Sequence, residues 1–142
     1  MSYTMTMPRR TRHDRASLRR RLLVRAVVWR ALLASRRKPK TLQRVLTKAS
    51  AGLPPVDHAT AERVHREVVL ASARCAGWRG CLPRSIAIAL LCKREGGWPD
   101  WCVGVRATPP FAAHAWLEAE RRMVGEPGEP ANYRPLIRVS TA

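Results

Sequence analysis

The hydrophobic pattern of this chain changes its period once, at Gly96-Gly97, and that change limits the folds open to it. Before the two glycines, apolar residues recur at the three-to-four-residue spacing of helices. After them, residues 101–105 predict one strand, and residues 113–119 and 122–126 predict a hairpin that turns near Glu120-Arg121. Because the helices come first and the strands follow, we expect an α+β domain.

Capping and turn residues divide the helical part into four predicted helices. They are expected over residues 18–35, over 41–49, from a cap at Asp57 or Thr60 to about residue 76, and over 81–95. Ser17 is suited to cap the first helix. Arginines occupy the other faces of that helix. One face is marked by the apolar side chains of Leu18, Leu22, Trp29, Leu32 and Leu33.

Positive charge is concentrated near the N-terminus. The chain has 27 Lys and Arg against 10 Asp and Glu, for a net charge of +17. Residues 1–50 hold 15 of the basic residues and a single acid, Asp14. Such a region suits an acidic partner, whether nucleic acid, an anionic membrane or an acidic protein, but it also fits a solvated surface without a partner. We expect three regions: a disordered basic arm over 1–17, basic amphipathic helices over 18–55, and a core over 56–142.

The cysteine pattern argues against metal and disulfide chemistry. Cys75, Cys81, Cys92 and Cys102 include no Cys-x-x-Cys pair, so a structural zinc site is not expected. The start of the chain is charged but lacks the apolar stretch of a signal peptide, which predicts a reduced, cytoplasmic protein without disulfides. We expect no cofactor and no membrane span, since the longest apolar stretch, 22–34, contains two arginines.

Cys81 has the setting of an activated thiol. It follows Gly80 at the predicted start of a helix, where unpaired backbone N–H groups and the helix dipole stabilise a thiolate. The same N–H groups are suited to bind a developing oxyanion. A lone cysteine at a helix start is more often a small buried hydrophobe, so Cys81 needs a partner base to be a candidate nucleophile.

His114 is the best placed of the four histidines to be that base. It begins a predicted strand within an apolar run, and by the period of two it shares a face with Trp116. Glu126 on the second strand of the hairpin would lie opposite or diagonal to it and could hold one imidazole nitrogen. A histidine in such a strand is commonly only a core residue, but the order cysteine helix, histidine strand, acid strand favours a thiol triad. The other cysteines are interpreted as structural, and the other histidines as surface residues.

Two sequence runs carry a family resemblance. The run GCLPRS at residues 80–85, continued by AIALL at 87–91, resembles the nucleophile helix of the leader peptidases of lasso-peptide biosynthesis. The runs GVR at 104–106 and FAAHAWLE at 111–118 resemble the histidine strand of the same family. These peptidases belong to the transglutaminase-like branch of papain-fold proteins, and the resemblance covers about residues 60–127.

The resemblance implies a transglutaminase-like core in which the nucleophile helix packs on a small antiparallel sheet. It implies Cys81 as nucleophile, His114 as base and Glu126 as orienting carboxylate. The family position of this acid usually holds Asp, and the turn that usually contains Gly is here Glu120-Arg121-Arg122. If the register of the hairpin slips by a residue, Glu118 or Glu120 becomes the alternative acid.

The implied function is a cysteine peptidase that removes the leader from a lasso-peptide precursor. We expect no leader-recognising winged-helix module, such as is found fused to some of these peptidases, within these 142 residues. The chain therefore resembles the stand-alone form, whose partners would be the precursor peptide, a separate recognition protein and a lactam-forming cyclase. Two alternatives remain open: an acyl transferase with the same triad, and a non-catalytic basic protein that binds nucleic acid or an anionic membrane. For the basic helices we favour a partner protein or a membrane over nucleic acid.

Overall fold

The computed structural model describes residues 17–141, so the predicted arm over 1–17 lies, apart from Ser17, outside the described residues. The helical part comprises α1 (Leu18–Ala34), α2 (Pro39–Ser50), α3 (His58–Ala71), α4 (Ala73–Ala76), the 3₁₀ turn η2 (Trp78–Gly80) and α5 (Cys81–Arg94). The strands are β1 (Asp100–Arg106), β2 (Ala113–Ala119), β3 (Arg122–Met123) and β4 (Tyr133–Val139), with the 3₁₀ turn η3 (Pro130–Asn132) before β4. The order of helices and strands confirms the α+β prediction.

Local capping chemistry explains where the helices begin and where one prediction was wrong. Ser17 accepts a hydrogen bond from the Arg20 amide and caps α1, as expected. The helix predicted up to residue 76 is in fact two helices, because Ser72 is extended at φ −144° and its hydroxyl accepts a hydrogen bond from the Cys75 amide. Ser72 thus ends α3 and caps α4, a local bond that competes with helix continuation.

The helix α1 packs on a different face from the one that its leucines mark. Its buried side chains are Val24, Val27, Val28 and Ala31. Leu18, Leu22, Trp29 and Leu33, which share the opposite face, are all exposed. Both faces of α1 are therefore apolar, and the β-branched face is the one that lies against the protein.

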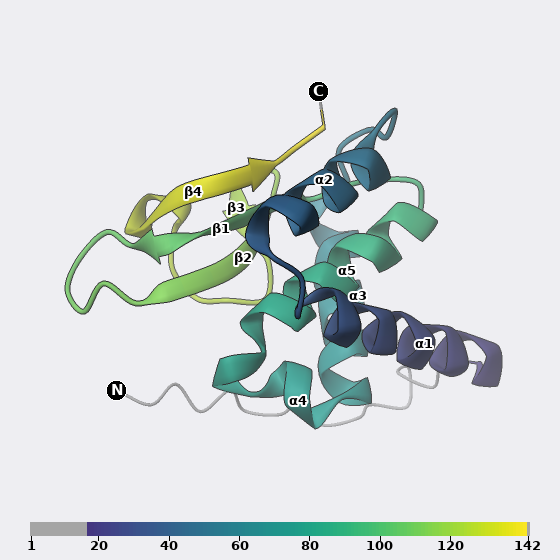
Figure 1. Cartoon of the computed structure of the whole chain (residues 1–142). Coiled ribbons are helices and arrows are strands. Elements are labelled where there is room, and N and C mark those ends of the chain that lie inside the picture. The colour runs from purple at the N-terminus through teal and green to yellow at the C-terminus, as the bar shows by residue number, and fades with distance from the viewer. Residues whose placement is uncertain (1–16, 142) are drawn as a thin grey trace.

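The helix α5 lies at the centre of the molecule, between α1 and α3 on one side and the sheet on the other (Figure 1). Its buried residues extend along nearly its whole length, from Arg84 to Cys92. The buried apolar residues of α1 and α2 belong to the same hydrophobic cluster as those of α5 and as Trp101 of β1 and Leu117 of β2. This burial holds the first turn of α5, where Cys81 lies, in a fixed place relative to the sheet.

The four strands form an antiparallel sheet in the order β3-β2-β1-β4. Glu120 and Arg121 have φ values of 52° and 61°, which confirms the turn predicted at these residues. The strand predicted over 122–126 is shorter than expected, because Gly125 at φ 69° turns the chain out of the sheet. The sequence did not predict β4, which pairs with β1 along the opposite edge.

Candidate active site

Cys81 is the first residue of α5, and the chain reaches it through a tight approach to α4. A side chain at Gly80 would overlap the carbonyl oxygen of Arg74, so only glycine fits there. Gly80 has φ −91°, which means that this close contact, and not a left-handed conformation, requires the glycine. Cys81 is partly exposed, whereas Cys75, Cys92 and Cys102 are buried. Cys81 is thus the accessible thiol among the described residues.

Arg84, one turn further along α5, ties the first turn of this helix to the segment before it. Its side chain is buried, with 5% exposure, and its Nη1 donates hydrogen bonds to the carbonyls of Cys75 at 2.8 Å and Gly77 at 3.2 Å. Its Nη2 lies 3.4 Å from Oε1 of Glu126. A guanidinium supplies several donors in a fixed plane, so one side chain can hold the loop before Cys81 and a carboxylate at the same time.

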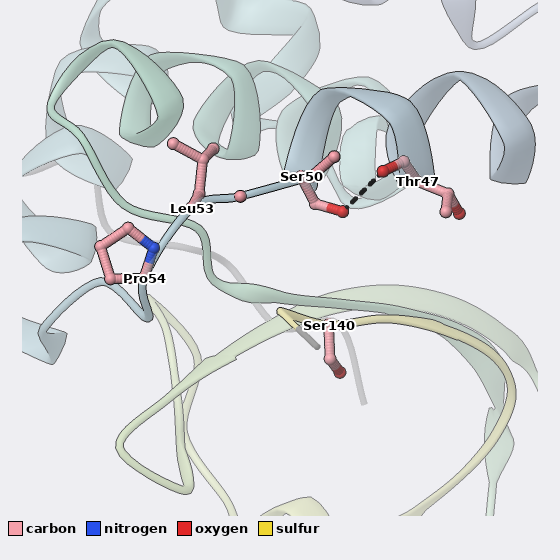
Figure 2. Close-up of a pocket in the computed structure, with 7 residues that line it drawn as sticks. Thr47, Ser50, Leu53, Pro54 and Ser140 are labelled. Carbon is pink, nitrogen blue, oxygen red and sulfur yellow. Dashed lines mark hydrogen bonds between the residues drawn. The ribbon is translucent and has the colours of Figure 1, made fainter.

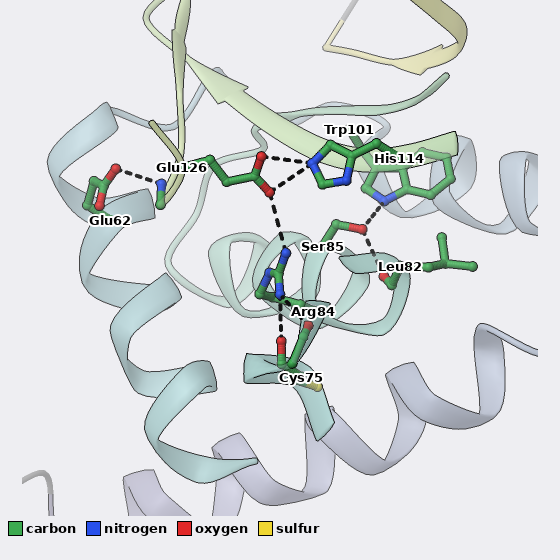
Figure 3. Close-up of polar contacts among 10 residues, drawn as sticks. Glu62, Cys75, Leu82, Arg84, Ser85, Trp101, His114 and Glu126 are labelled. Atoms are coloured by element: carbon green, nitrogen blue, oxygen red, sulfur yellow. Dashed lines mark hydrogen bonds and ion pairs between the residues drawn. The ribbon is translucent and has the colours of Figure 1, made fainter. Parts of the chain in front are cut away.

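A second polar contact fixes α5 against β1. The indole N–H of Trp101 donates to the hydroxyl of Ser85 at 3.0 Å, and this hydroxyl donates to the carbonyl of Leu82 at 2.8 Å (Figure 3). Trp101 is fully buried, so the pairing leaves no indole N–H without a partner in the core. The sequence pattern did not indicate a role for Ser85 or Arg84, although both lie in the GCLPRS run, just before the apolar residues 86–92 of α5.

His114 lies near the start of β2, with aromatic rings beside its imidazole. The ring centroids of His114 and Tyr133 are 5.2 Å apart, and those of His114 and Trp116 are 6.1 Å apart. Tyr133 begins β4, so the strand that the sequence did not predict supplies one wall of the histidine's environment. Stacking of this kind restricts rotation of the imidazole.

Glu126 is the carboxylate that lies beside His114. Nε2 of His114 is 2.8 Å from Oε2 and 3.0 Å from Oε1 of Glu126, and the same carboxylate faces Arg84 (Figure 3). The structure therefore brings Cys81, His114 and Glu126 together, since the imidazole of His114 also interacts with the thiol of Cys81 and shifts its pKa. With Nε2 directed to Glu126, Nδ1 is the ring nitrogen left for the thiol.

The two alternative acids have other partners. Glu118 is buried and accepts hydrogen bonds from the indole of Trp116 at 2.8 Å and from Arg138 at 3.2 Å. Glu120 is exposed in the turn and pairs with Arg122. Neither carboxylate is paired with His114 by any hydrogen bond or ion pair in the described residues.

The loop that carries Glu126 is held from the side of α3. The Gly125 amide donates to Glu62 at 2.8 Å, and Nε2 of His58 contacts the carbonyl of Met123 at 2.9 Å. A side chain at Gly125 would overlap the ring of His65, whose Nε2 is buried without a hydrogen-bond partner among the described residues. The interpretation of His58 and His65 as surface residues was therefore wrong. Both pack under this loop, because α3 turns one face towards it.

The electrostatics of the site favour an ion pair between Cys81 and His114. Burial alone would raise the pKa of the Cys81 thiol, but the interaction with His114, the Ala115 amide and the charges of His114 and Arg84 outweigh it and lower that pKa from its ordinary value. Burial likewise opposes the charged form of His114, yet its bonds to Cys81 and Glu126 and their charges raise its pKa to about 9. A thiolate beside an imidazolium is the reactive form of such a pair.

The other three cysteines have the opposite character. Burial is the main cause that raises the pKa of Cys75, and it raises the pKa of Cys92 and of Cys102 to about 12. At neutral pH these thiols remain protonated and packed in the interior. Their environments agree with the structural interpretation of all three.

A surface hollow of about 550 Å³ lies away from this site, where the α2–α3 connection meets the end of β4 (Figure 2). Its lining has hydroxyl groups, but those of Thr47 and Ser50 donate to backbone carbonyls of their own helix. No titratable side chain lines the hollow, so it offers no acid, base or activated nucleophile.

Two kinds of feature are absent from residues 17–141. No cluster of three or more His, Cys, Asp or Glu side chains there could bind a metal ion. In the same residues, every helix is too short or too polar to cross a bilayer.

Comparison with known proteins gives one match. The family model described as the transglutaminase-like superfamily matches residues 23–138, which span α1 to the end of β4. Neither the curated proteins nor the solved structures contain a match to this chain. The matched range includes the thiol, the imidazole and the carboxylate described above.

Proposed function

This chain belongs to the transglutaminase-like superfamily, which includes cysteine peptidases, and we propose that it is such a peptidase and that it removes the leader from a ribosomally made lasso-peptide precursor. Cys81 is the proposed nucleophile, His114 the general acid and base, and Glu126 the carboxylate that orients the imidazole. The observation that carries the proposal is the chain of contacts from the thiol at the start of α5 through His114 to Glu126.

The reaction proceeds in two steps. The Cys81 thiolate attacks the carbonyl carbon of the scissile peptide bond, and backbone N–H groups at the start of α5 bind the oxyanion. The C–N bond then breaks as the His114 imidazolium gives its proton to the leaving amine, which leaves a thioester on Cys81. Neutral His114 removes a proton from water and the resulting hydroxide attacks the thioester. The C–S bond then breaks, the acid product is released, and the thiolate–imidazolium pair of Cys81 and His114 is restored.

The lasso precursor as substrate is supported by the resemblance of the GCLPRS and FAAHAWLE runs to the leader peptidases. A site that is partly exposed, at the surface between a helix and a sheet, suits an extended peptide more than a small enclosed substrate. We further propose that a separate leader-recognition protein presents the precursor, and that a lactam-forming cyclase takes the freed core peptide.

An acyl transferase would use the same first step. The thioester on Cys81 would then react with an amine in place of water, with His114 removing the proton of that amine. The two activities share every residue named here, so the mass of the product is what separates them.

The test is mass spectrometry of a lasso precursor incubated with this protein and its leader-recognition protein. The expected result is a leader-length fragment and a free core peptide, with the mass of one water gained in total. A Cys81→Ala chain should give neither product, while a Cys92→Ala chain, which removes a buried thiol outside the site, should retain the activity if it folds.

Two outcomes would contradict the proposal. Cleavage by the Cys81→Ala chain would exclude the thiol mechanism. No cleavage by the wild type, in the presence of a recognition protein shown to bind the leader, would exclude this substrate. Labelling of Cys81 by a thiol-directed probe in the second case would still support a cysteine enzyme with another peptide as its substrate.

A further inference from the structure

The outer face of α1 is an apolar stripe without any covering element in the described part of the chain. Its large side chains have exposures of 72% for Leu18, 58% for Leu22, 67% for Trp29 and 55% for Leu33. At about 100° per residue, these four positions fall within an arc of about 60° on the helix. Monomeric soluble proteins seldom gather several large apolar side chains on one exposed face without a use for it.

Arginines border the stripe on both sides. By the same geometry, Arg21 and Arg25 lie along one edge and Arg19 and Arg30 along the other, and all four are exposed. Arg20, in contrast, points inward and pairs with Glu67 at 2.7 Å and Glu95 at 3.0 Å. The carboxylates near α1 are therefore engaged on its inner side, away from the stripe.

The charged side chains of α1 and α2 are all basic. Residues 18–50 contain 11 Lys or Arg and no Asp or Glu. The helix that follows, α2, adds the exposed Lys40, Arg44 and Lys48. A surface of this composition attracts an anionic partner over several ångströms and repels a basic one.

The shape of the surface is convex. The inner face of α1 packs against α5 and α3, so the stripe is the outer ridge of a helix at the margin of the molecule (Figure 1). Leucines and a tryptophan on such a ridge suit the boundary between lipid headgroups and acyl chains, where tryptophan is favoured. Arginines beside it can lay their methylene stems on apolar surface and reach the headgroup phosphates.

We propose that the outer face of α1 is a membrane-binding surface that docks this protein on a bilayer containing anionic lipids. Leu18, Leu22, Trp29 and Leu33 enter the interface, and the flanking arginines bind the headgroups. The helix lies in the plane of the bilayer and does not cross it. The docking uses no residue of the candidate active site, so it does not depend on the proposed peptidase activity.

The experiment is flotation of the full-length protein with vesicles of phosphatidylcholine alone, or with roughly 30 mol % phosphatidylglycerol added. The wild type should float with the anionic vesicles and remain largely unbound with the neutral ones. Raising the salt to about 0.5 M should weaken binding, since it screens the arginines. The Cys81→Ala chain should bind as the wild type does, which separates this proposal from the peptidase proposal.

Variants of exposed residues keep the test free of folding effects. The pair Leu22→Ser and Trp29→Ser should lower the partition coefficient by about tenfold or more, because both apolar anchors are lost. The matched control is Leu136→Ser, which removes an equally exposed leucine from β4 and should leave binding unchanged. Circular dichroism and the melting temperature should be the same for all three chains.

Four outcomes would overturn the proposal. These are a wild type that fails to float, equal flotation with neutral vesicles, a stripe variant that floats like the wild type, and an equal loss in the Leu136→Ser control. A wild-type dimer that the stripe variant dissociates, without vesicle binding, would instead identify a second copy of the chain as the occupant of this face.

Discussion

Replacing Glu126 by Gln tests the electrostatics of the site with little change of shape. The variant keeps an oxygen that can accept a hydrogen bond from Nε2 of His114, but it removes the negative charge 2.8 Å from that nitrogen. Glu126 is one of the groups that raise the pKa of His114 to about 9. We expect the imidazolium to become less stable, and with it the thiolate of Cys81.

The size of the effect follows from the hydrogen bond that changes. A bond to a charged group contributes about 1.5–3 kcal/mol and a neutral one about 0.5–1.5 kcal/mol, so the exchange removes roughly 1–1.5 kcal/mol. At 1.36 kcal/mol per pKa unit, the pKa of His114 should fall by about one unit, from about 9 towards about 8. The same energy taken from the transition state lowers kcat/KM by about tenfold.

The assay is kcat/KM for leader cleavage as a function of pH. Activity needs the thiolate, which is lost as pH falls through the pKa of Cys81, and the imidazolium, which is lost as pH rises through the pKa of His114. In the wild type the alkaline limb should therefore lie near pH 9. In Glu126→Gln that limb should move to lower pH and the acid limb to higher pH, so the profile narrows from both sides.

Glu118→Gln is the matched control, because Glu118 is a buried carboxylate of the neighbouring strand β2 whose partners are Trp116 and Arg138. It should lower the melting temperature and leave both limbs of the profile in place. A wild-type profile in Glu126→Gln, or a shift of the limbs in Glu118→Gln in its stead, would refute this role of the Glu126 charge.

Three further predictions concern the same part of the molecule. Iodoacetamide at neutral pH should label Cys81 ahead of the buried cysteines, and His114→Ala should slow this labelling because it raises the pKa of the Cys81 thiol. Peptide mapping that finds a buried cysteine labelled first would contradict this prediction. Gly80→Ala should lower the free energy of unfolding in urea by about 1–3 kcal/mol, because its side chain would overlap the Arg74 carbonyl. Gly77→Ala is the control and should cost less, since a side chain has room there. Equal losses of stability in the two variants would contradict the close contact at Gly80. Arg84→Met should cost about 3 kcal/mol because it leaves the carbonyls of Cys75 and Gly77 without their donor and removes the charge that faces Glu126. It should also move the acid limb of the pH profile to higher pH, since Arg84 helps to lower the pKa of Cys81, and Arg84→Lys should partly restore that limb. An unchanged profile would make Arg84 only structural.

The local chemistry of the chain was enough to predict most of the elements. The change of period at Gly96-Gly97 predicts helices followed by an antiparallel sheet, and a cap such as Ser17 or a turn such as Glu120-Arg121 acts within a few residues of itself. Cys81 at a helix start is visible for the same reason, since a helix terminus and its dipole are local features.

The errors of prediction lie where a residue's surroundings come from distant segments. The face that α1 buries was not readable from its leucines, because both faces are apolar and only packing against α5 chooses between them. The strand β4 contains a proline and alternates poorly, and it forms because the edge of β1 offers unpaired backbone groups.

Taken by itself, the sequence determined the class of fold, the thiol at the start of a helix and a histidine in a strand. It left three carboxylates as candidates for the group beside that histidine. Only the tertiary structure decided for Glu126, because Gly125 turns the chain out of the hairpin and Glu62 and Arg84, from two different helices, hold the loop. Contacts within one helix or turn are set by spacing along the chain, whereas contacts between α3, α5 and this loop depend on how the whole core packs.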